Sequence, residues 1–150
     1  MLLVTPGERD LDALMTMMEA FNRFESIVWT RATGEAPLRQ LIGDPSLGFV
    51  VLARERANAP DLGYAVVTFG FDLEWGGRDA FLTELWLEPA ARGHGVGARV
   101  LAAVETRARA AGARAMHLMV RHANANAQAL YRRAGYSVPE RLFMTRRLPD

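Results

Sequence analysis

The chain has 150 residues, half of them apolar and 23% charged, with a net charge of +1, and this length suits a single domain over residues 1–150 with its own core. It contains no cysteine, which excludes disulfides, thiolate metal sites and a cysteine nucleophile and fits a cytoplasmic protein. No apolar run reaches the ~18–20 residues of a membrane helix and the N-terminus lacks the pattern of a signal peptide, so we expect no membrane partner.

The N-terminal third predicts a strand and two helices. Leu2-Leu3-Val4 is a short apolar strand, and Thr5-Pro6-Gly7-Glu8 after it has the pattern of a capping box with proline at the first helical position. Apolar residues at helical spacing then predict a helix that runs to about Phe24. We expect a polar, irregular stretch over residues 25–35 and a short helix over residues 36–42.

The middle of the chain predicts three antiparallel strands. Residues 49–53 form the first, and residues 63–72, rich in β-branched and aromatic side chains, form the second. Gly76-Gly77 favours a tight hairpin turn, and the partner strand runs from about residue 79 to residue 87.

The last third predicts two helices around a strand, followed by a hairpin. One helix follows the glycine-rich turn at residues 92–97, and a buried strand covers residues 115–120. A second helix opens at Asn124 and is closed by Gly135, and residues 136–148 form a final hairpin. The whole order predicts an α+β fold, with a mixed, mainly antiparallel central sheet of about seven strands flanked by about four helices.

The turn Arg92-Gly93-His94-Gly95-Val96-Gly97 joins a strand to an amphipathic helix and has the properties of an anion site. Glycine lets the backbone approach phosphate oxygens closely. The first N–H groups of the helix lack intrahelical acceptors and lie at the positive end of its dipole. Arg92 adds a positive charge beside them. Taken alone, the same pattern also suits a simple tight loop.

A nucleotide-binding motif of another kind fits this turn less well. Gly93-His94-Gly95-Val96-Gly97-Ala98 satisfies a loose dinucleotide fingerprint. That fold requires a mostly parallel sheet with several strand–helix units after the motif, whereas one such unit follows here. The Walker form is excluded because Gly-Lys-Ser/Thr is absent. The turn therefore indicates a phosphate-bearing ligand without identifying it.

Two motifs in the right order make the sequence resemble the GNAT superfamily of N-acetyltransferases. The family signature Arg/Gln-x-x-Gly-x-Gly/Ala is matched by Arg92, Gly95 and Gly97, after a strand that ends in Leu85-Trp86-Leu87-Glu88-Pro89. A second family pattern, Asn-x-x-Ala-x-x-Leu-Tyr-x-x-x-Gly-Phe/Tyr, is matched at every spacing by Asn124, Ala127, Leu130, Tyr131, Gly135 and Tyr136. Residues 76–85 are similar to a bacterial subset described as histone-acetyltransferase-like.

The resemblance implies acetyl-CoA as co-substrate and assigns its contacts. Backbone N–H groups of the turn would hold the pyrophosphate, from Arg92, Gly93, His94, Gly95, Val96, Gly97 and Ala98. The main chain of Leu85, Trp86 and Leu87 would pair with the pantetheine arm as an added strand does, and an N–H there would stabilise the tetrahedral oxyanion. Asn124 would hydrogen-bond the pantetheine region, and Arg132 or Arg133 would reach the 3′-phosphate.

Two side chains are candidates for the chemistry. By the same resemblance, Tyr131 would be the general acid, and a phenol of pKa ~10 can donate a proton to a leaving thiolate of pKa ~8–9. Glu84 is the candidate base that accepts the amine proton, directly or through water. On a regular strand Glu84 and Trp86 share one face, and the bulge that the resemblance implies here would change that alternation. A packing tyrosine and a solvated carboxylate are the alternatives.

Other titratable residues carry weaker expectations. Glu19 and Glu25 flank the end of the first helix, where they could attract a cationic amine. His117, among apolar residues of a strand, is expected to be a hydrogen-bonded core histidine. Three scattered histidines without cysteine predict no metal site.

The sequence thus predicts an enzyme that transfers an acetyl group from acetyl-CoA to a primary amine of a small molecule or protein, with the acceptor open and a homodimer as a further expectation. A non-catalytic acyl-CoA-binding module is the alternative. Residues 92–150 hold eleven arginines and three acids, against seven and fourteen in residues 1–91. This basic half also admits a nucleic-acid partner, the weakest of the three readings.

Overall fold

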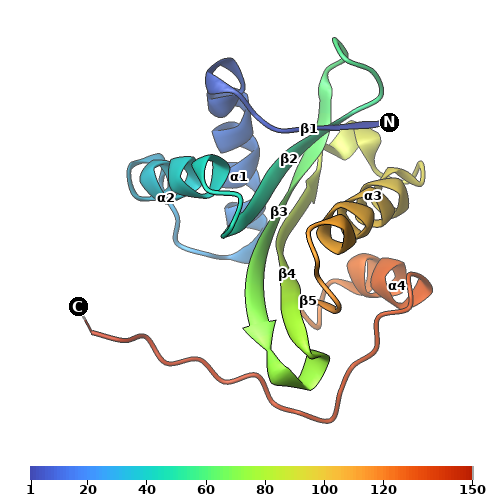
Figure 1. Cartoon of the computed structure of the whole chain (residues 1–150). Helices are drawn as coiled ribbons and strands as arrows, with labels where there is room; N and C mark the ends of the chain where they lie inside the picture. The colour runs from blue at the N-terminus through green and yellow to red at the C-terminus, as the bar shows by residue number, and fades with distance from the viewer. Residues whose placement is uncertain (150) are drawn as a thin grey trace.

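The computed structural model describes residues 1–149, and in this part of the chain one five-stranded sheet is flanked by four α-helices (Figure 1). The strands are β1 (Leu2–Val4), β2 (Gly48–Arg54), β3 (Asp61–Asp72), β4 (Gly77–Leu87) and β5 (Met116–Leu118). The helices are α1 (Leu11–Glu25), α2 (Arg31–Gly43), α3 (Val96–Ala110) and α4 (Ala125–Arg133). The strands lie side by side in sequence order, with β4 and β5 parallel and every other pair antiparallel. The predicted mixed α+β fold is confirmed, with five strands instead of seven.

Both N-terminal helices begin at other residues than predicted. The backbone N–H of Gly7 donates to Asp10 Oδ2 at 2.8 Å and a 3₁₀ turn leads into α1, so the capping box predicted at Thr5 is wrong. Helix α2 begins at Arg31, five residues before the predicted start, because Thr30 Oγ1 accepts the N–H of Thr33 at 3.3 Å and caps the helix. The stretch predicted to be irregular is therefore largely helical.

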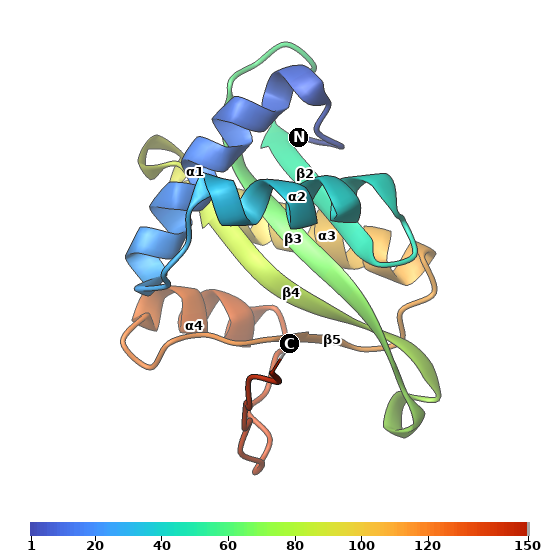
Figure 2. The ribbon, with the colours of Figure 1, turned by 90° about the vertical axis from the view of Figure 1, so that its left-hand side faces the viewer.

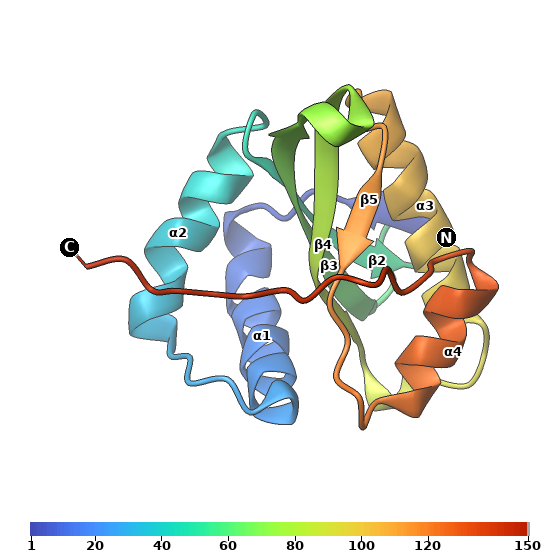
Figure 3. The same ribbon diagram turned by 90° about the horizontal axis from the view of Figure 1, so that it is seen from below.

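Helices α1 and α2 cover one face of the sheet, and α3 and α4 lie on the opposite side (Figures 2 and 3). Alternate residues of the strands divide between the two faces. The face toward α1 carries Val50, Leu52, Tyr64, Val66 and Trp86. The face toward α3 carries Val51, Ala53, Ala65, Val67 and Leu82, which pack with Val100, Leu101 and Val104 of that helix. Two apolar cores thus fix β3 and β4 from both sides.

The segment after α4 differs most from the prediction. Residues 134–149 form no helix or strand, so the hairpin predicted over residues 136–148 is wrong. The segment passes beneath the sheet from α4 toward the α2 side (Figure 3). Its large apolar side chains are exposed, namely Val138, Leu142, Phe143, Met144 and Leu148. A strand on a sheet is stabilised by burial of one face, and these side chains gain no such burial.

Candidate active site

The parallel strands β4 and β5 pair over a short distance only. Ala80–Leu82 pair with Met116–Leu118, and β4 then continues to Leu87 beyond the end of β5. On the other side β4 stays paired with β3 through Leu87. Residues 83–87 therefore present one backbone edge with no partner strand among the described residues, and we refer to this space beside β4 as the wedge. The predicted pantetheine strand, Leu85, Trp86 and Leu87, is this edge.

A β-bulge sets the direction of Glu84. Val66 pairs with Glu84 and Val67 with Leu82, so Thr83 is the extra residue, and its hydroxyl donates to the carbonyl of Val66 at 3.2 Å. Before the bulge, Leu82 faces the α3 core. After it, Glu84 and Trp86 lie on the α1 face of the sheet. The bulge expected from the family resemblance is present.

The carboxyl group of Glu84 is hydrogen-bonded by a residue that sequence reasoning did not identify. The hydroxyl of the fully buried Tyr64 donates to Glu84 Oε2 at 2.5 Å. Burial raises the pKa of the Glu84 carboxyl above its ordinary value, and the hydrogen bond from Tyr64 opposes part of that rise. Burial and the nearby Glu84 charge raise the pKa of Tyr64 far above its usual range, so its hydroxyl remains a donor. The Glu84 carboxylate therefore accepts a proton at a higher pH than an exposed glutamate does.

The glycine-rich turn forms an open loop at the start of α3. Gly93 and Gly95 have φ of +80° and +73°, in the left-handed region that residues with a Cβ rarely adopt. A Cβ at either position would meet no atom within 4 Å, so the backbone faces open space. Of the other predicted contacts, Val96 is buried while His94 and Ala98 are exposed, so Val96 can offer only its backbone.

Arg92 and Gly97 connect this turn to the wedge. The Arg92 guanidinium lies 4.5 Å above the Trp86 ring, and its Nε donates to the Leu87 carbonyl at 2.9 Å. The charge of Arg92 is thus held in a fixed place at the end of β4, next to the turn. A Cβ on Gly97 would lie 3.3 Å from Leu130 Cδ2, so α3 and α4 come close beside the wedge.

Tyr131, the predicted general acid, lies on helix α4. Asn124 Oδ1 accepts the N–H of Ala127 at 3.2 Å and caps the helix, so the residue predicted to bind pantetheine also has a structural task. Tyr131 is largely buried, and burial together with the Glu25 charge raises the pKa of its hydroxyl to about 12. A phenol with this pKa stays protonated at neutral pH. Arg133 is exposed at the end of the helix.

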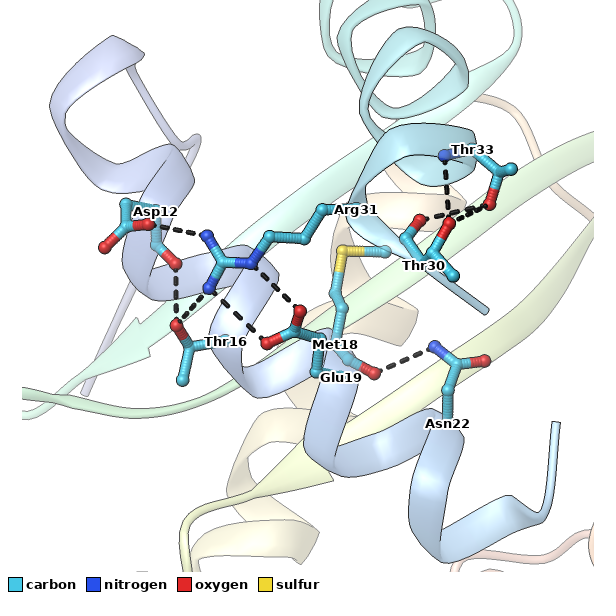
Figure 4. Close-up of polar contacts among 8 residues, drawn as sticks. All are labelled: Asp12, Thr16, Met18, Glu19, Asn22, Thr30, Arg31 and Thr33. Atoms are coloured by element: carbon cyan, nitrogen blue, oxygen red, sulfur yellow. Dashed lines mark hydrogen bonds and ion pairs between the residues drawn. The ribbon is translucent and has the colours of Figure 1, made fainter. Parts of the chain in front are cut away.

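A cluster of polar contacts around Arg31 joins α1 to α2 (Figure 4). Arg31 binds Asp12 Oδ1 at 2.6 Å, Thr16 Oγ1 at 2.7 Å and Glu19 Oε1 at 3.0 Å. Both Glu19 oxygens face this guanidinium, the second at 3.5 Å. Glu19 therefore shares one guanidinium with Asp12, and it also lines the adjoining cavity, so its attraction for a substrate amine stays a prediction.

A cavity of about 330 Å³ opens beside this cluster, lined by Glu19, Asn22, Arg23, Ile27, Val28 and Trp29. Asn22 is buried and donates from Nδ2 to the Met18 carbonyl at 2.8 Å (Figure 4). The Trp29 ring packs on Gly34, where an added Cβ would lie 2.1 Å from Trp29 Cζ2. The cavity lies at the end of α1, the region where a substrate amine was expected to approach, but the sequence did not single out Asn22 or Trp29 as lining residues. The Thr30 cap was the local signal that α2 begins at Arg31.

His117 lies outside the fully buried core. Its Nε2 is 3.3 Å from Asp79 Oδ2, and its ring centroid lies 5.6 Å from that of Trp75 and 6.4 Å from that of Phe81. The side chain is 33% exposed, so the predicted hydrogen-bonded core histidine is a partly exposed partner of Asp79.

A comparison of sequences leads to the same family as these structural features. They are the order of the elements, the bulge, the open glycine turn and the helix with Tyr131. The sequence model of the acetyltransferase (GNAT) family matches residues 14–136. The chain belongs to this family. GNAT acetyltransferases use acetyl-CoA as the acetyl donor. No curated protein matches the chain in sequence.

Solved structures share the GNAT fold over the whole chain. An integron cassette protein, HFX_CASS3, from the mobile metagenome of Cole Harbour Salt Marsh is 27% identical, with a TM-score of 0.82 over 99% of this chain and 91% of that one. A putative acetyltransferase from Arthrobacter sp. FB24 is 24% identical, with a TM-score of 0.80 over 99% and 96%. The aminoglycoside antibiotic 6′-N-acetyltransferase AAC(6′)-IG from Acinetobacter haemolyticus is 16% identical, with a TM-score of 0.78 over all of both chains.

Two further properties of this GNAT chain concern the described residues 1–149. None of their helices has the length and apolar character required to span a bilayer. Among the same residues, no three or more His, Asp or Glu side chains come together as a potential metal site.

Proposed function

We propose that this protein transfers the acetyl group of acetyl-CoA to a primary amine, in one direct step. The observation that carries the proposal is the bulge at Thr83, which turns Glu84 onto the α1 face at the start of the unpaired edge of β4. A proton acceptor thereby lies next to the backbone that would hold the thioester. We also propose that residues 1–150 act as one domain.

The residues present fit the coenzyme in two places. The left-handed backbone at Gly93 and Gly95, with open space where a Cβ would lie, suits a pyrophosphate held by N–H groups at the start of α3. The free edge of β4 from residue 83 to Leu87 offers the main-chain groups that an extended pantetheine arm would pair with. Arg133, exposed at the end of α4, is the proposed contact of the 3′-phosphate.

Glu84 is the proposed base. An ammonium group has no free electron pair, so it must lose a proton before its nitrogen can attack the thioester carbon. The raised pKa of Glu84 lets this carboxylate accept that proton closer to neutral pH than an exposed glutamate would. Tyr64 stabilises the carboxylate between turnovers through its hydrogen bond.

Tyr131 is the proposed acid. When the nitrogen attacks and the C–S bond breaks, the sulfur leaves as a thiolate, and the Tyr131 hydroxyl would donate a proton to it. Its pKa of about 12 keeps the hydroxyl protonated before this step. An N–H group of Leu85, Trp86 or Leu87 would hydrogen-bond the oxyanion that forms on the carbonyl oxygen.

The acceptor would enter from the α1 and α2 side, since the cavity beside Asn22 and Trp29 lies on the same face of the sheet as Glu84. The AAC(6′)-IG protein, whose name describes acetylation of an aminoglycoside, shares the fold at 16% identity only, so its acceptor is one class among several to test.

The test is a thiol-release assay with acetyl-CoA and a panel of amines that includes aminoglycosides, polyamines, amino acids and lysine peptides, with products identified by mass spectrometry. We expect CoA release that depends on one class of amine, together with an acetamide product. Tight binding of acetyl-CoA without turnover on any amine would instead favour a non-catalytic acyl-CoA-binding module. The sequence contains no lysine, so any acetyl-lysine detected belongs to the acceptor.

A further inference from the structure

Arg121, between β5 and α4, connects three parts of the molecule around the wedge. Its Nε lies 3.0 Å from Glu25 Oε2, and its Nη2 donates to the carbonyl of Phe24 at 2.6 Å. Its guanidinium carbon also lies 4.8 Å from the centre of the Phe24 ring. One side chain thus contacts the carboxylate, the backbone and an aromatic face at the C-terminal end of α1.

The backbone of Arg121 is joined to α4. Its carbonyl accepts the N–H of Asn124 at 2.9 Å and the side-chain amide of Gln128 at 3.0 Å. These two residues belong to the cap and first turn of the helix that carries Tyr131. A movement of the Arg121 backbone would therefore be passed to α4 through two hydrogen bonds.

Phe24 extends the connection to β4. Its ring packs edge-on against Trp86, with the centroids 6.1 Å apart. Trp86 in turn lies under the Arg92 guanidinium, next to the glycine-rich turn. The end of α1 is thus held between the wedge strand on one side and Arg121 on the other.

The position of helix α4 depends on its contact with Arg121 more than the positions of α1 and α3 depend on any single contact. None of the residues from Ala125 to Arg133 is fully buried, whereas α1 and α3 each bury at least five side chains. Leu130 and Tyr131 pack against the α3 core, but no side chain of α4 is fully buried, so this helix has less packing to fix its position than α1 or α3. The Glu25 carboxylate is 18% exposed and the Arg121 side chain 39% exposed, so water reaches this ion pair from the arginine side and screens it in part.

We propose that Arg121 is a positioning residue for acetyl transfer, which ties α4 to the end of α1 and so holds Tyr131 over the wedge. This rests on the proposed function, in which Tyr131 protonates the leaving thiolate. Arg121 itself need not touch the substrate. Its contribution is to keep the Tyr131 hydroxyl within reach of the sulfur, where small displacements are costly to the rate.

The first experiment is a double-mutant cycle on kcat. We expect Arg121→Gln to lower kcat roughly 10- to 100-fold, with a much smaller change in the KM of acetyl-CoA. In a Tyr131→Phe background the same substitution should change kcat by less than about twofold, because the group it positions is absent. Equal losses in both backgrounds would overturn the proposal. Arg121→Lys, which keeps the charge opposite Glu25 but loses the planar fork, should recover part of the rate.

The second experiment needs no enzymatic activity. Hydrogen exchange in Arg121→Gln should become faster in residues 125–133 and at the end of α1, and should stay unchanged in α3. Unaltered exchange in α4 would refute this tie between α4 and α1, which we call the Arg121 clamp, whichever amine is the acceptor. The matched control is Arg39→Gln, which removes exposed ion pairs with Glu8 and Glu35 on the far side of α2 and should alter neither measurement.

The outcomes separate the two proposals. Faster exchange in α4 while Tyr131→Phe retains the full rate would uphold the clamp and reject the acid role. Normal exchange in α4 while Tyr131→Phe is slow would uphold the acid and reject the clamp.

Discussion

Replacing Tyr64 with phenylalanine tests how the half-buried carboxylate of Glu84 works as a base. The substitution keeps the ring in the core and removes only the hydroxyl that donates to Glu84 Oε2 at 2.5 Å. Two influences act on the Glu84 carboxyl, since burial raises its pKa and the Tyr64 hydrogen bond lowers it. Loss of the hydroxyl leaves burial unopposed, so the pKa of Glu84 should rise further above its ordinary value.

The size of the pKa change at Glu84 follows from the hydrogen bond from Tyr64 that is lost. A hydrogen bond to a charged group contributes about 1.5–3 kcal/mol, and 1.36 kcal/mol corresponds to a tenfold change in an acid dissociation constant. Water that reaches the partly exposed carboxylate will replace some of this bond, so we expect the lower end, roughly a tenfold change. On the acid limb of the profile kcat/KM is proportional to the fraction of ionised Glu84, and it should fall by the same factor. On the alkaline plateau Glu84 is ionised in both proteins, and the rates should converge.

The assay is the pH dependence of kcat/KM for thiol release, with the fastest amine of the panel. Glu84→Gln is the matched control, because its amide oxygen can still accept from Tyr64 while the base is lost. It should lower the plateau by roughly 10²- to 10⁴-fold, the usual range for a general base. If the acid limbs of Tyr64→Phe and wild type superimpose, Tyr64 does not tune the base. If Glu84→Gln retains the wild-type profile, the base lies elsewhere.

Stability provides a second readout with a defined sign. A carboxyl whose pKa is raised by folding binds protons more tightly in the native state, so the free energy of unfolding falls as pH rises from the unfolded pKa through the folded one. The further rise in Tyr64→Phe should make this fall steeper and extend it to higher pH. The difference from wild type in urea unfolding should therefore be smallest in acid and grow toward neutral pH. A constant difference across this range would contradict the expected coupling.

The remaining predictions concern the acid and the glycine-rich turn. Tyr131→Phe should lower kcat roughly 10- to 1000-fold with little change in acetyl-CoA affinity measured by calorimetry, and an unchanged kcat would reject the acid role. Gly95→Val should abolish measurable acetyl-CoA binding, because a β-branched residue at φ +73° strains the turn and places methyl groups in the open space before α3. Gly43→Ala, on α2 with no atom within 4 Å of the added Cβ, is its control and should bind normally.

Features that depend on neighbouring residues could be predicted from the sequence. The glycine-rich turn, the start of α3 and the Asn124 cap of α4 follow from φ preferences and capping, which act over a few residues. Two motifs at fixed spacing were enough to predict the family before any contact was known. The early start of α2 was missed, although its signal at Thr30 is equally local.

The final hairpin shows where local preference is not sufficient. Residues 136–148 carry apolar side chains on both sides of a turn expected near Pro139-Glu140, yet a strand also requires a partner edge and a face to bury. The segment pairs with no strand of the described residues, although β5 ends the sheet with one edge unpaired, and its apolar side chains remain exposed. Strand propensity describes how well a side chain fits a half-buried sheet, so it has little effect when no sheet receives it.

The sequence alone determined which residues are available for acetyl transfer, because motif spacing and backbone preference are properties of short segments. The tertiary structure decided how they are used. The register between β3 and β4 creates the bulge that directs Glu84 toward Tyr64, and folding brings Arg121 against Phe24, 97 positions away in the chain. Such contacts depend on how strands pair and which faces are buried, and these are settled only when the whole chain packs.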